Sequence, residues 1–137
     1  MSGEHTYDYS IIRVVPRVDR GEQINVGVIL SCANVDFLDA RIELDEKAVL
    51  AVDPTVDLEA LRGNLELIPR VCRGGAAAGA IGALPSRGRF RWLISPRSTI
   101  IQPSPVHTGR TDDPAACLNR LMEKLVTRPS AERQPNG

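Results

Sequence analysis

Residues 24–44, INVGVILSCANVDFLDARIEL, decide the fold class of this chain. Apolar and polar side chains alternate in Ile24–Ser31 and again in Phe37–Leu44, as expected for strands that bury one face. The turn-rich Asn34–Asp36 links these two segments, and a link this short joins antiparallel strands. Tyr7–Val15, rich in Tyr, Ile and Val, predicts a further strand before them. The chain therefore begins with an antiparallel meander.

The middle of the chain contains a predicted helix. Leucine and isoleucine recur at intervals of three and four residues in Leu58–Ile68, which places them on one helical face. Asp57 and Glu59 suit the first turn of this helix, because the helix dipole favours negative charge there. Pro69 is expected to kink or end the helix. A shorter helix is predicted over Asp45–Val52.

Two further strands and a final helix are predicted in the second half. Arg87–Ser95 alternates between arginine and other side chains, which predicts a strand. A turn at 95–98 leads to a short strand over Thr99–Gln102. Asp113 suits a helix N-cap, because Pro114 follows it at the first helical position. The expected buried stripe of that helix comprises Leu118, Leu121, Met122, Leu125 and Val126.

These elements predict an α+β fold, with an antiparallel sheet of about five strands and two to three helices packed on it. We expect a loose head at 1–6, a single domain at 7–127 and a disordered tail at 128–137. Within the domain, the Gly/Ala-rich tract Gly74–Leu84 is expected to be a mobile connector.

Charge is distributed unevenly, although the net charge of the 137-residue chain is zero. Residues 67–111 contain no Asp or Glu, whereas residues 1–66 carry an excess of acids. The seven arginines of the acid-free stretch are Arg70, Arg73, Arg87, Arg89, Arg91, Arg97 and Arg110. Two interpretations remain open. The arginines form an internal network with the carboxylates of the first half, or they bind an external anion or an acidic partner.

Composition argues against several classes of protein. The three cysteines have no short spacing, so the sequence predicts neither a disulfide framework nor a metal site. We find no signal peptide and no apolar run long enough to span a membrane, which favours a cytoplasmic protein without membrane contact. The sequence contains neither a P-loop nor a dinucleotide-binding glycine motif, and no cofactor is predicted.

The candidate residues for binding an anion or a partner lie in the acid-free stretch. On a strand, Arg89 and Arg91 would lie about 7 Å apart on one face, a separation that suits successive phosphates or carboxylates. His107 lies in a Pro/Gly-rich segment near Ser104 and Arg110. Three roles remain open for it: a general base, a phosphate contact, or a residue that stabilises its own turn. The full set of candidates is Arg89, Arg91, Arg97, Ser98, Ser104, His107 and Arg110.

A separate candidate lies in the strand over Ile24–Ser31. Asn25 is a polar residue between apolar neighbours, so we consider it a candidate for lining a cleft. Gly27, two residues later, marks a bulge or a close approach of the backbone.

Three strings of sequence resemble a known bacterial family. They are YDYSIIRVVP at 7–16, INVGVIL at 24–30, and RFRWL at 89–93 through SPVH at 104–107. Over about residues 7–127, the chain resembles the family called domain of unknown function 3037. The resemblance implies a small, stand-alone cytoplasmic protein with no established activity or cofactor. Some similar proteins are encoded beside kinases of the HipA type, so it also implies a neighbouring kinase or toxin-like protein as a candidate partner.

Together, these observations favour a non-catalytic interaction or accessory module. The alternative is an enzyme or sensor that acts on a phosphate-bearing ligand, and it requires Arg89, Arg91, Arg97 and His107 to converge in one pocket. Binding of a nucleic-acid backbone ranks third, because aromatic residues are few and both Phe90 and Trp92 are predicted to face away from the arginines. That function would require a steep loss of affinity with salt.

Overall fold

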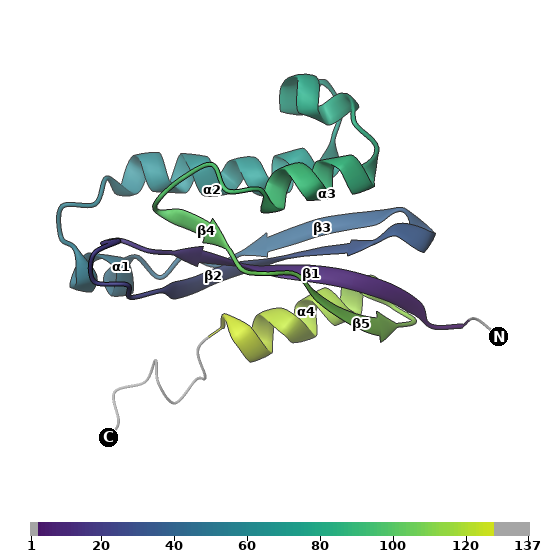
Figure 1. Cartoon of the computed structure of the whole chain (residues 1–137), viewed down its shortest axis with the longest axis horizontal. Coiled ribbons are helices and arrows are strands. Elements are labelled where there is room, and N and C mark those ends of the chain that lie inside the picture. The colour runs from purple at the N-terminus through teal and green to yellow at the C-terminus, as the bar shows by residue number, and fades with distance from the viewer. Residues whose placement is uncertain (1–2, 128–137) are drawn as a thin grey trace.

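The computed structural model describes residues 3–127 (Figure 1). Its elements, in chain order, are β1 (His5–Val14), β2 (Ile24–Cys32), η1 (Ala33–Val35), β3 (Phe37–Ile42), α1 (Glu46–Val52), α2 (Leu58–Arg73), η2 (Ala76–Ala83), α3 (Ser86–Ile94), β4 (Ile101–Pro103), β5 (His107–Thr111) and α4 (Pro114–Leu125). β1 begins inside the expected loose head, because His5 and Thr6 pair with residues of β5. The predicted disordered tail, 128–137, lies outside the described residues.

The strands form one antiparallel sheet around β1. β2 pairs with one edge of β1, and β3 extends the sheet beyond β2. The other edge of β1 is shared, because β4 pairs with residues 12–14 and β5 with residues 5–9. Between these two pairings, Ser10 and Ile11 of β1 lie opposite three residues, 104–106. β4 and β5 are thus one edge strand interrupted by a bulge.

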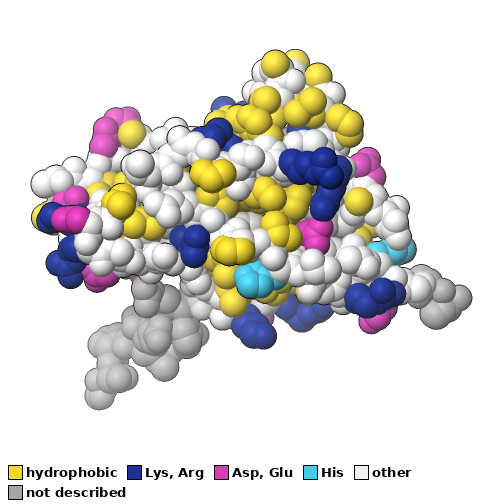
Figure 2. All heavy atoms as spheres, in the orientation of Figure 1, with side chains coloured by type: hydrophobic (Ala, Val, Ile, Leu, Met, Phe, Trp, Pro, Cys, Tyr) yellow, Lys and Arg dark blue, Asp and Glu magenta, His cyan; other side chains and the backbone are white. Residues whose placement is uncertain are grey.

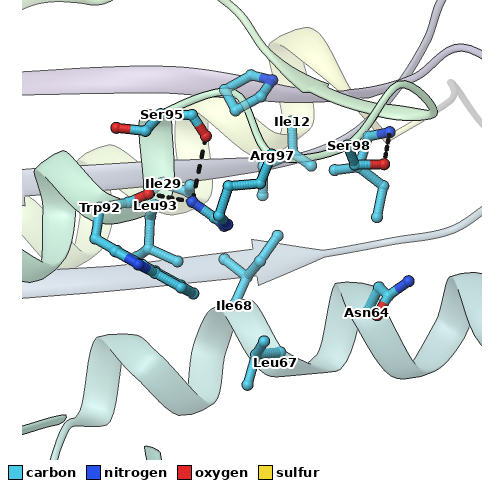
Figure 3. A pocket seen from close by; sticks show the side chains of 12 residues that line it. Ile12, Ile29, Asn64, Leu67, Ile68, Trp92, Leu93, Ser95, Arg97 and Ser98 are labelled. Atoms are coloured by element: carbon cyan, nitrogen blue, oxygen red, sulfur yellow. Dashed lines mark hydrogen bonds between the residues drawn. The ribbon is translucent and has the colours of Figure 1, made fainter. Parts of the chain in front are cut away.

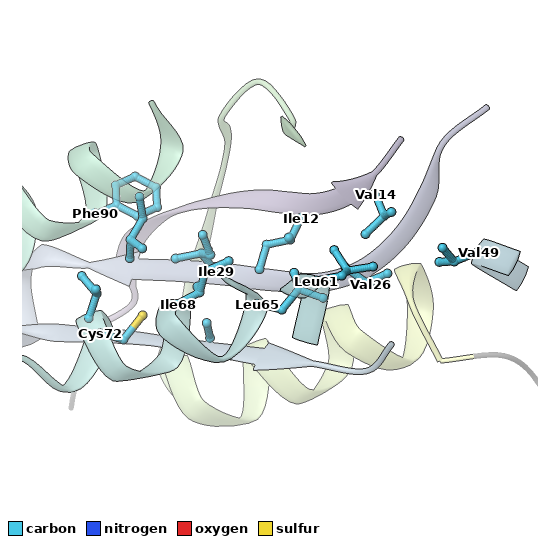
Figure 4. Close-up of a cluster of buried hydrophobic side chains, with 13 residues drawn as sticks. Ile12, Val14, Val26, Ile29, Val49, Leu61, Leu65, Ile68, Cys72 and Phe90 are labelled. Atoms are coloured by element: carbon cyan, nitrogen blue, oxygen red, sulfur yellow. The ribbon is translucent and has the colours of Figure 1, made fainter. Parts of the chain in front are cut away.

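Helices cover both faces of the sheet (Figure 1). α2 and α3 pack on one face, where Leu65 and Phe90 meet Ile12 and Ile29 of the sheet in the larger buried cluster (Figure 4). α4 packs on the opposite face. The smaller cluster beneath it contains Val28, Leu30, Cys32, Cys117, Leu118 and Met122. The predicted α+β architecture is confirmed, with α2 and α3 on one side of the sheet and α4 on the other, but the described residues form more helices than the two to three expected.

Aspartates begin three of the helices. Asp45, Asp57 and Asp113 each accept a hydrogen bond, at 3.0–3.1 Å, from the backbone N–H three residues later. The predicted N-cap at Asp113 is confirmed. Of the two outcomes expected at Pro69, a kink or an end of the helix, the end is wrong, because α2 continues to Arg73. The turn after Pro69 carries buried apolar side chains, whose packing on the sheet favours continuation of the helix.

The predicted strand over Arg87–Ser95 is wrong as well, because this segment forms α3. Phe90 and Leu93 are both buried and lie three residues apart, which is the spacing of one helical face. A helix turns by about 100° per residue, so the three arginines do not share a face as they would on a strand. The described residues still hold five strands. The fifth is β5, in a segment that the sequence predicted to be a loop.

Two segments between the main elements also differ from expectation. The turn at 95–98 leads from α3 into β4 rather than between two strands. The Gly/Ala-rich tract contains η2, and its Ala78 and Ile81 pack against the larger cluster. Among the described helices, none combines the length and apolar character needed to cross a membrane.

Candidate functional site

A concavity lies between the sheet and the helices α2 and α3 (Figure 3). Its volume is about 350 Å³. We call it the α2–α3 pocket. Its lining residues are Ile12, Ile29, Asn64, Leu67, Ile68, Trp92, Leu93, Ser95, Arg97, Ser98, Ile101 and Pro103. Figure 2 views the molecule from the β4–β5 edge and shows hydrophobic side chains gathered between the helices above and the edge strands below.

Apolar side chains form the walls of the pocket. Ile12 and Ile29 come from the sheet, Ile68 from α2 and Leu93 from α3, and all four are buried. The helix and strand periodicities explain this convergence, because each residue belongs to the inward face of its element. A concave surface with apolar walls and a few polar groups is typical of sites that bind small molecules.

Arg97 lies at the rim of the pocket, stacked on an aromatic ring. Its guanidinium carbon is 3.7 Å from the centre of the Trp92 indole ring, which makes a cation–π contact. One terminal nitrogen, Nη1, donates hydrogen bonds to the carbonyl oxygens of Trp92 and Ser95. Partial burial lowers the pKa of the Arg97 guanidinium. The Arg97 side chain stays exposed to solvent, and these contacts hold its positive charge beside the apolar walls (Figure 3).

The other polar residues at the rim are Asn64, Ser95 and Ser98, all exposed. The Ser98 hydroxyl accepts hydrogen bonds from the backbone N–H groups of Ile100 and Ile101, at 3.1 and 3.2 Å. The Ser98 side chain therefore shapes the loop that enters β4. Asn64, on α2, has no hydrogen-bond partner among residues 3–127. Its amide is free to bind a guest molecule.

The structure does not bring the predicted arginine candidates together. Arg89 lies at the junction of α2 and α3, where it donates to the backbone carbonyls of Val71, Cys72 and Leu84. Arg91 is exposed, and its guanidinium has no partner within the described part of the chain. Of the candidate arginines, only Arg97 lines the α2–α3 pocket.

Arg87 forms the strongest internal contact of the acid-free stretch. Its guanidinium donates to the Asp8 carboxylate at 2.6 Å and to the Ser31 hydroxyl at 3.1 Å. Thr108 donates to the second oxygen of the same carboxylate at 2.7 Å. Burial would raise the pKa of Asp8, but the hydrogen bonds from Thr108 and Arg87 outweigh it and lower the pKa. This network fastens α3 to β1, β2 and β5.

Three further candidates have local structural roles. Ser104 is buried in the bulge between β4 and β5, where its hydroxyl accepts from the Ile11 N–H at 2.8 Å. Arg110 pairs with Glu4 at 3.6 Å on the surface. Asn25 donates to the backbone carbonyl of Leu125 at 3.1 Å, which ties β2 to the end of α4. None of the three lines the α2–α3 pocket.

His107 lies on the opposite face of the sheet from the pocket. Its ring stacks on Tyr9, with the ring centres 5.1 Å apart, and Tyr9 packs against the cluster under α4. The convergence of His107 with Arg97 that a shared phosphate site requires is therefore not observed. Within residues 3–127, no three His, Cys, Asp or Glu side chains come close enough together to hold a metal ion.

Sequence reasoning missed the pocket itself. Its lining comes from β1, β2, β4, α2, α3 and the loop before β4, and α3 was predicted to be a strand. The available signal was the spacing of Phe90, Leu93 and Ile94, at three and four residues, which is that of one helical face. Asn64 was not predicted as a site residue, because nothing in the sequence distinguishes it from the other polar residues of its helix.

The seven arginines of the acid-free stretch divide by partner. Arg87 and Arg110 pair with acids of the first half of the chain. Arg89 and Arg97 bind backbone carbonyls. The remaining three, Arg70, Arg73 and Arg91, are exposed and have no partner in the part of the chain that the structure describes. An internal network with carboxylates thus accounts for two of the seven.

Comparison with protein families matches residues 9–126 of the chain to the family described as "Protein of unknown function (DUF3037)". No curated protein and no solved structure matches the chain. The matched region covers nearly all the described residues, and the α2–α3 pocket lies wholly within it.

Proposed function

Because the chain belongs to the DUF3037 family of proteins of unknown function, we propose its role from its geometry: a non-catalytic binding module whose α2–α3 pocket holds a small amphipathic guest. The observation that carries this proposal is Arg97, an exposed cation that stacking on Trp92 holds at the rim of an apolar pocket. Apolar walls favour burial of hydrocarbon, and a few polar groups orient what is buried.

The contacts of the polar residues favour binding over chemistry. Ser98 accepts backbone hydrogen bonds within its own loop, and the Ser95 hydroxyl donates to the Arg91 carbonyl at 2.8 Å. Arg97 and Asn64 are suited to hold charge and hydrogen bonds rather than to transfer protons. The alternative of one phosphate site built from Arg89, Arg91, Arg97 and His107 loses its support, because these side chains lie apart.

Chemical-shift mapping tests the proposal. The ¹H–¹⁵N spectrum of the protein would be recorded with octanol, octanoate and octyl phosphate, each below its micelle concentration. We expect saturable shifts concentrated in α3, the loop at 95–100 and the middle of α2. Shifts scattered over both faces of the sheet, or no saturable shift with any probe, would contradict the proposal.

A protein partner is the second candidate, and the three exposed arginines without acidic partners among the described residues favour it. Arg70 and Arg73 end α2, and Arg91 lies on α3. Unpaired surface arginines suit an acidic protein surface. Co-expression with a HipA-type kinase encoded beside the gene, followed by native mass measurement, tests this candidate. A stable complex that weakens when all three arginines become glutamine would support it, and two separate species would count against it.

A further inference from the structure

We propose that the guest of the α2–α3 pocket is a small monocarboxylic acid, with its apolar tail among the isoleucines and its carboxylate on Arg97. This inference rests on the proposed binding function and names the chemical class of the guest. Three features of the rim and the walls support it: the hydrogen-bonding edge that Arg97 leaves open, the side-chain amide of Asn64, and the size of the cavity.

The first feature is the pattern of hydrogen bonds made by Arg97. Both bonds from its guanidinium to the backbone leave from Nη1. Nε and Nη2 have no hydrogen-bond partner among the described residues. These two nitrogens form one edge of the planar guanidinium, and their N–H groups match the two oxygens of a carboxylate. Stacking on Trp92 and the bonds to the carbonyls hold this edge in place before a ligand arrives.

Charge also favours a carboxylate. Arg97 is the single charged residue that lines the pocket in the described structure, so the site offers one positive charge. One guanidinium balances a carboxylate, whereas phosphate groups carry more charge and usually gather several cationic or backbone donors. Desolvation destabilises the charged form of Arg97 and lowers its pKa, and a bound anion would offset this destabilisation.

The second feature is Asn64, which lines the pocket from α2 without a hydrogen-bond partner in residues 3–127. Its side-chain amide carries two donors and can hydrogen-bond a polar group of the guest. Figure 3 shows Asn64 and Arg97 on different elements of the pocket, α2 and the loop before β4.

The third feature is the cavity. Its volume of about 350 Å³ is at the lower end of the range of roughly 300–1,000 Å³ for small-molecule sites. The walls formed by Ile12, Ile29, Ile68 and Leu93 offer no charged group to a ligand tail. A short aliphatic or aromatic tail therefore fits, and a long lipid does not.

Trp92 makes the test direct, because it is the one tryptophan in the sequence and lies in the pocket wall under Arg97. Titration of the intact protein with octanoate, followed by tryptophan fluorescence and calorimetry, should give saturable one-site binding. Octanol and octyl phosphate, at matched concentrations below micelle formation, should each bind at least about tenfold more weakly, because the charged hydrogen bonds to Arg97 need a planar monoanion.

Three variants locate the carboxylate. Arg97→Gln should weaken octanoate binding about tenfold or more and leave octanol binding unchanged within about twofold. Asn64→Ala should weaken octanoate binding several-fold. This second variant keeps the loop contacts of Arg97 intact. Arg91→Gln is the matched control, because Arg91 is an exposed arginine of α3 that does not line the pocket, and it should bind like the wild type. Circular dichroism confirms that each variant is folded.

The outcomes separate the two proposals. If octanol binds as well as octanoate and Arg97→Gln has no effect, the pocket binds guests but the carboxylate assignment is wrong. Tighter binding of octyl phosphate than of octanoate also overturns the assignment. If no probe changes the fluorescence of Trp92 or produces heat, both the carboxylate assignment and the binding function fail.

Discussion

Gly27 lies where the sheet leaves no room for a side chain. A Cβ atom at this position would be 2.5 Å from the Arg41 carbonyl oxygen, and a backbone atom cannot move aside as a side chain can. It would also be 3.0 Å from Ile12, a wall of the α2–α3 pocket. The expected close approach of the backbone at Gly27 is thus confirmed, and it belongs to packing rather than to a ligand.

Gly27→Ala should therefore lower the free energy of unfolding by about 1–3 kcal/mol, the usual effect of overpacking. Gly63→Ala is the matched control, since Gly63 lies in α2, where an added Cβ atom would meet nothing within 4 Å. Alanine is the better helix former, so this change should raise stability by about 0.5–1 kcal/mol. Urea unfolding measures both. Equal effects of the two substitutions would contradict the packing account.

Asp8 makes the stability of the domain depend on pH. Hydrogen bonds from Thr108 and Arg87 outweigh the effect of burial and hold its pKa below the usual value. A carboxylate with a lowered folded pKa stabilises the protein above its unfolded pKa of about 3.9, and that contribution is lost as pH falls through the folded pKa. We expect the wild type to lose more stability than Asp8→Asn between pH 5 and pH 3.

Asp112→Asn serves as the control for this pH dependence, because Asp112 is exposed and has no partner among residues 3–127. Its pH profile should follow that of the wild type. Urea midpoints measured across the pH range provide the comparison. A profile for Asp8→Asn parallel to that of the wild type would show that Asp8 does not couple folding to pH.

At the scale of the element, α3 is the segment whose sequence pattern predicts the wrong secondary structure. Arginine at 87, 89 and 91 imitates strand alternation, yet a helix forms because Phe90 and Leu93 fall on one face above the sheet. The two-residue steps of the arginines match a strand, whereas the three-residue step from Phe90 to Leu93 matches a helix, and the packing of these apolar side chains decides between the two. The meander and the cap of α4 were predictable because their signals are local. β5 was not, since its pairing with β1 spans about 100 residues of sequence.

Arg89 should be the side chain that holds α3 to the end of α2. Gly74, with φ 73°, ends α2 and lies against the Arg89 guanidinium, which binds the carbonyls of Val71 and Cys72. The Cys72 carbonyl has no continuing helix to bind it, whereas the Val71 carbonyl also accepts from the Gly74 N–H at 3.0 Å. Arg89→Met should cost about 1.5–3 kcal/mol of stability, the range for hydrogen bonds to charged groups.

Arg91→Met is the control for Arg89→Met, because it removes an arginine from the same helix without removing an observed contact. It should change stability by less than about 0.5 kcal/mol. Hydrogen exchange of the amides in α3 gives a local readout, and protection should fall in Arg89→Met alone. Similar exchange in the two variants would remove the structural role assigned to Arg89.

At the scale of the whole molecule, the candidate site was predictable only in part. Arg97 and Ser98 were chosen for their place in an acid-free stretch, and both line the pocket. His107 and Ser104 were chosen from the same stretch, but the edge strand turns His107 to the α4 face and buries Ser104 in its bulge. Residues that are close in sequence can lie on opposite faces of a strand that contains a bulge, because one extra residue reverses the face that the following side chains occupy.

The two buried clusters lie on opposite faces of one sheet, so we expect them to open separately. α4 supplies half of the smaller cluster and is joined to the sheet through side-chain packing rather than strand pairing. Local unfolding follows such boundaries. The cysteines report it, because Cys32 and Cys117 lie in the smaller cluster and Cys72 lies in the larger one.

In the folded protein, all three thiols should react slowly with iodoacetamide. Burial raises the pKa of Cys72 to about 12 and also raises the pKa of Cys32, and the thiolate is the reactive form. Leu118→Ala removes a fully buried side chain from α4 and should cost about 2–5 kcal/mol. In this variant, Cys32 and Cys117 should be labelled before Cys72.

Leu65→Ala is the reciprocal control, because Leu65 is a buried residue of α2 in the larger cluster. It should expose Cys72 first. Pulse labelling followed by mass spectrometry of proteolytic peptides resolves the three sites. If all three cysteines react at one common rate in both variants, the sheet and its helices open as a single unit. In that case, a guest bound in the α2–α3 pocket would stabilise the α4 face of the sheet as strongly as the face on which the pocket lies.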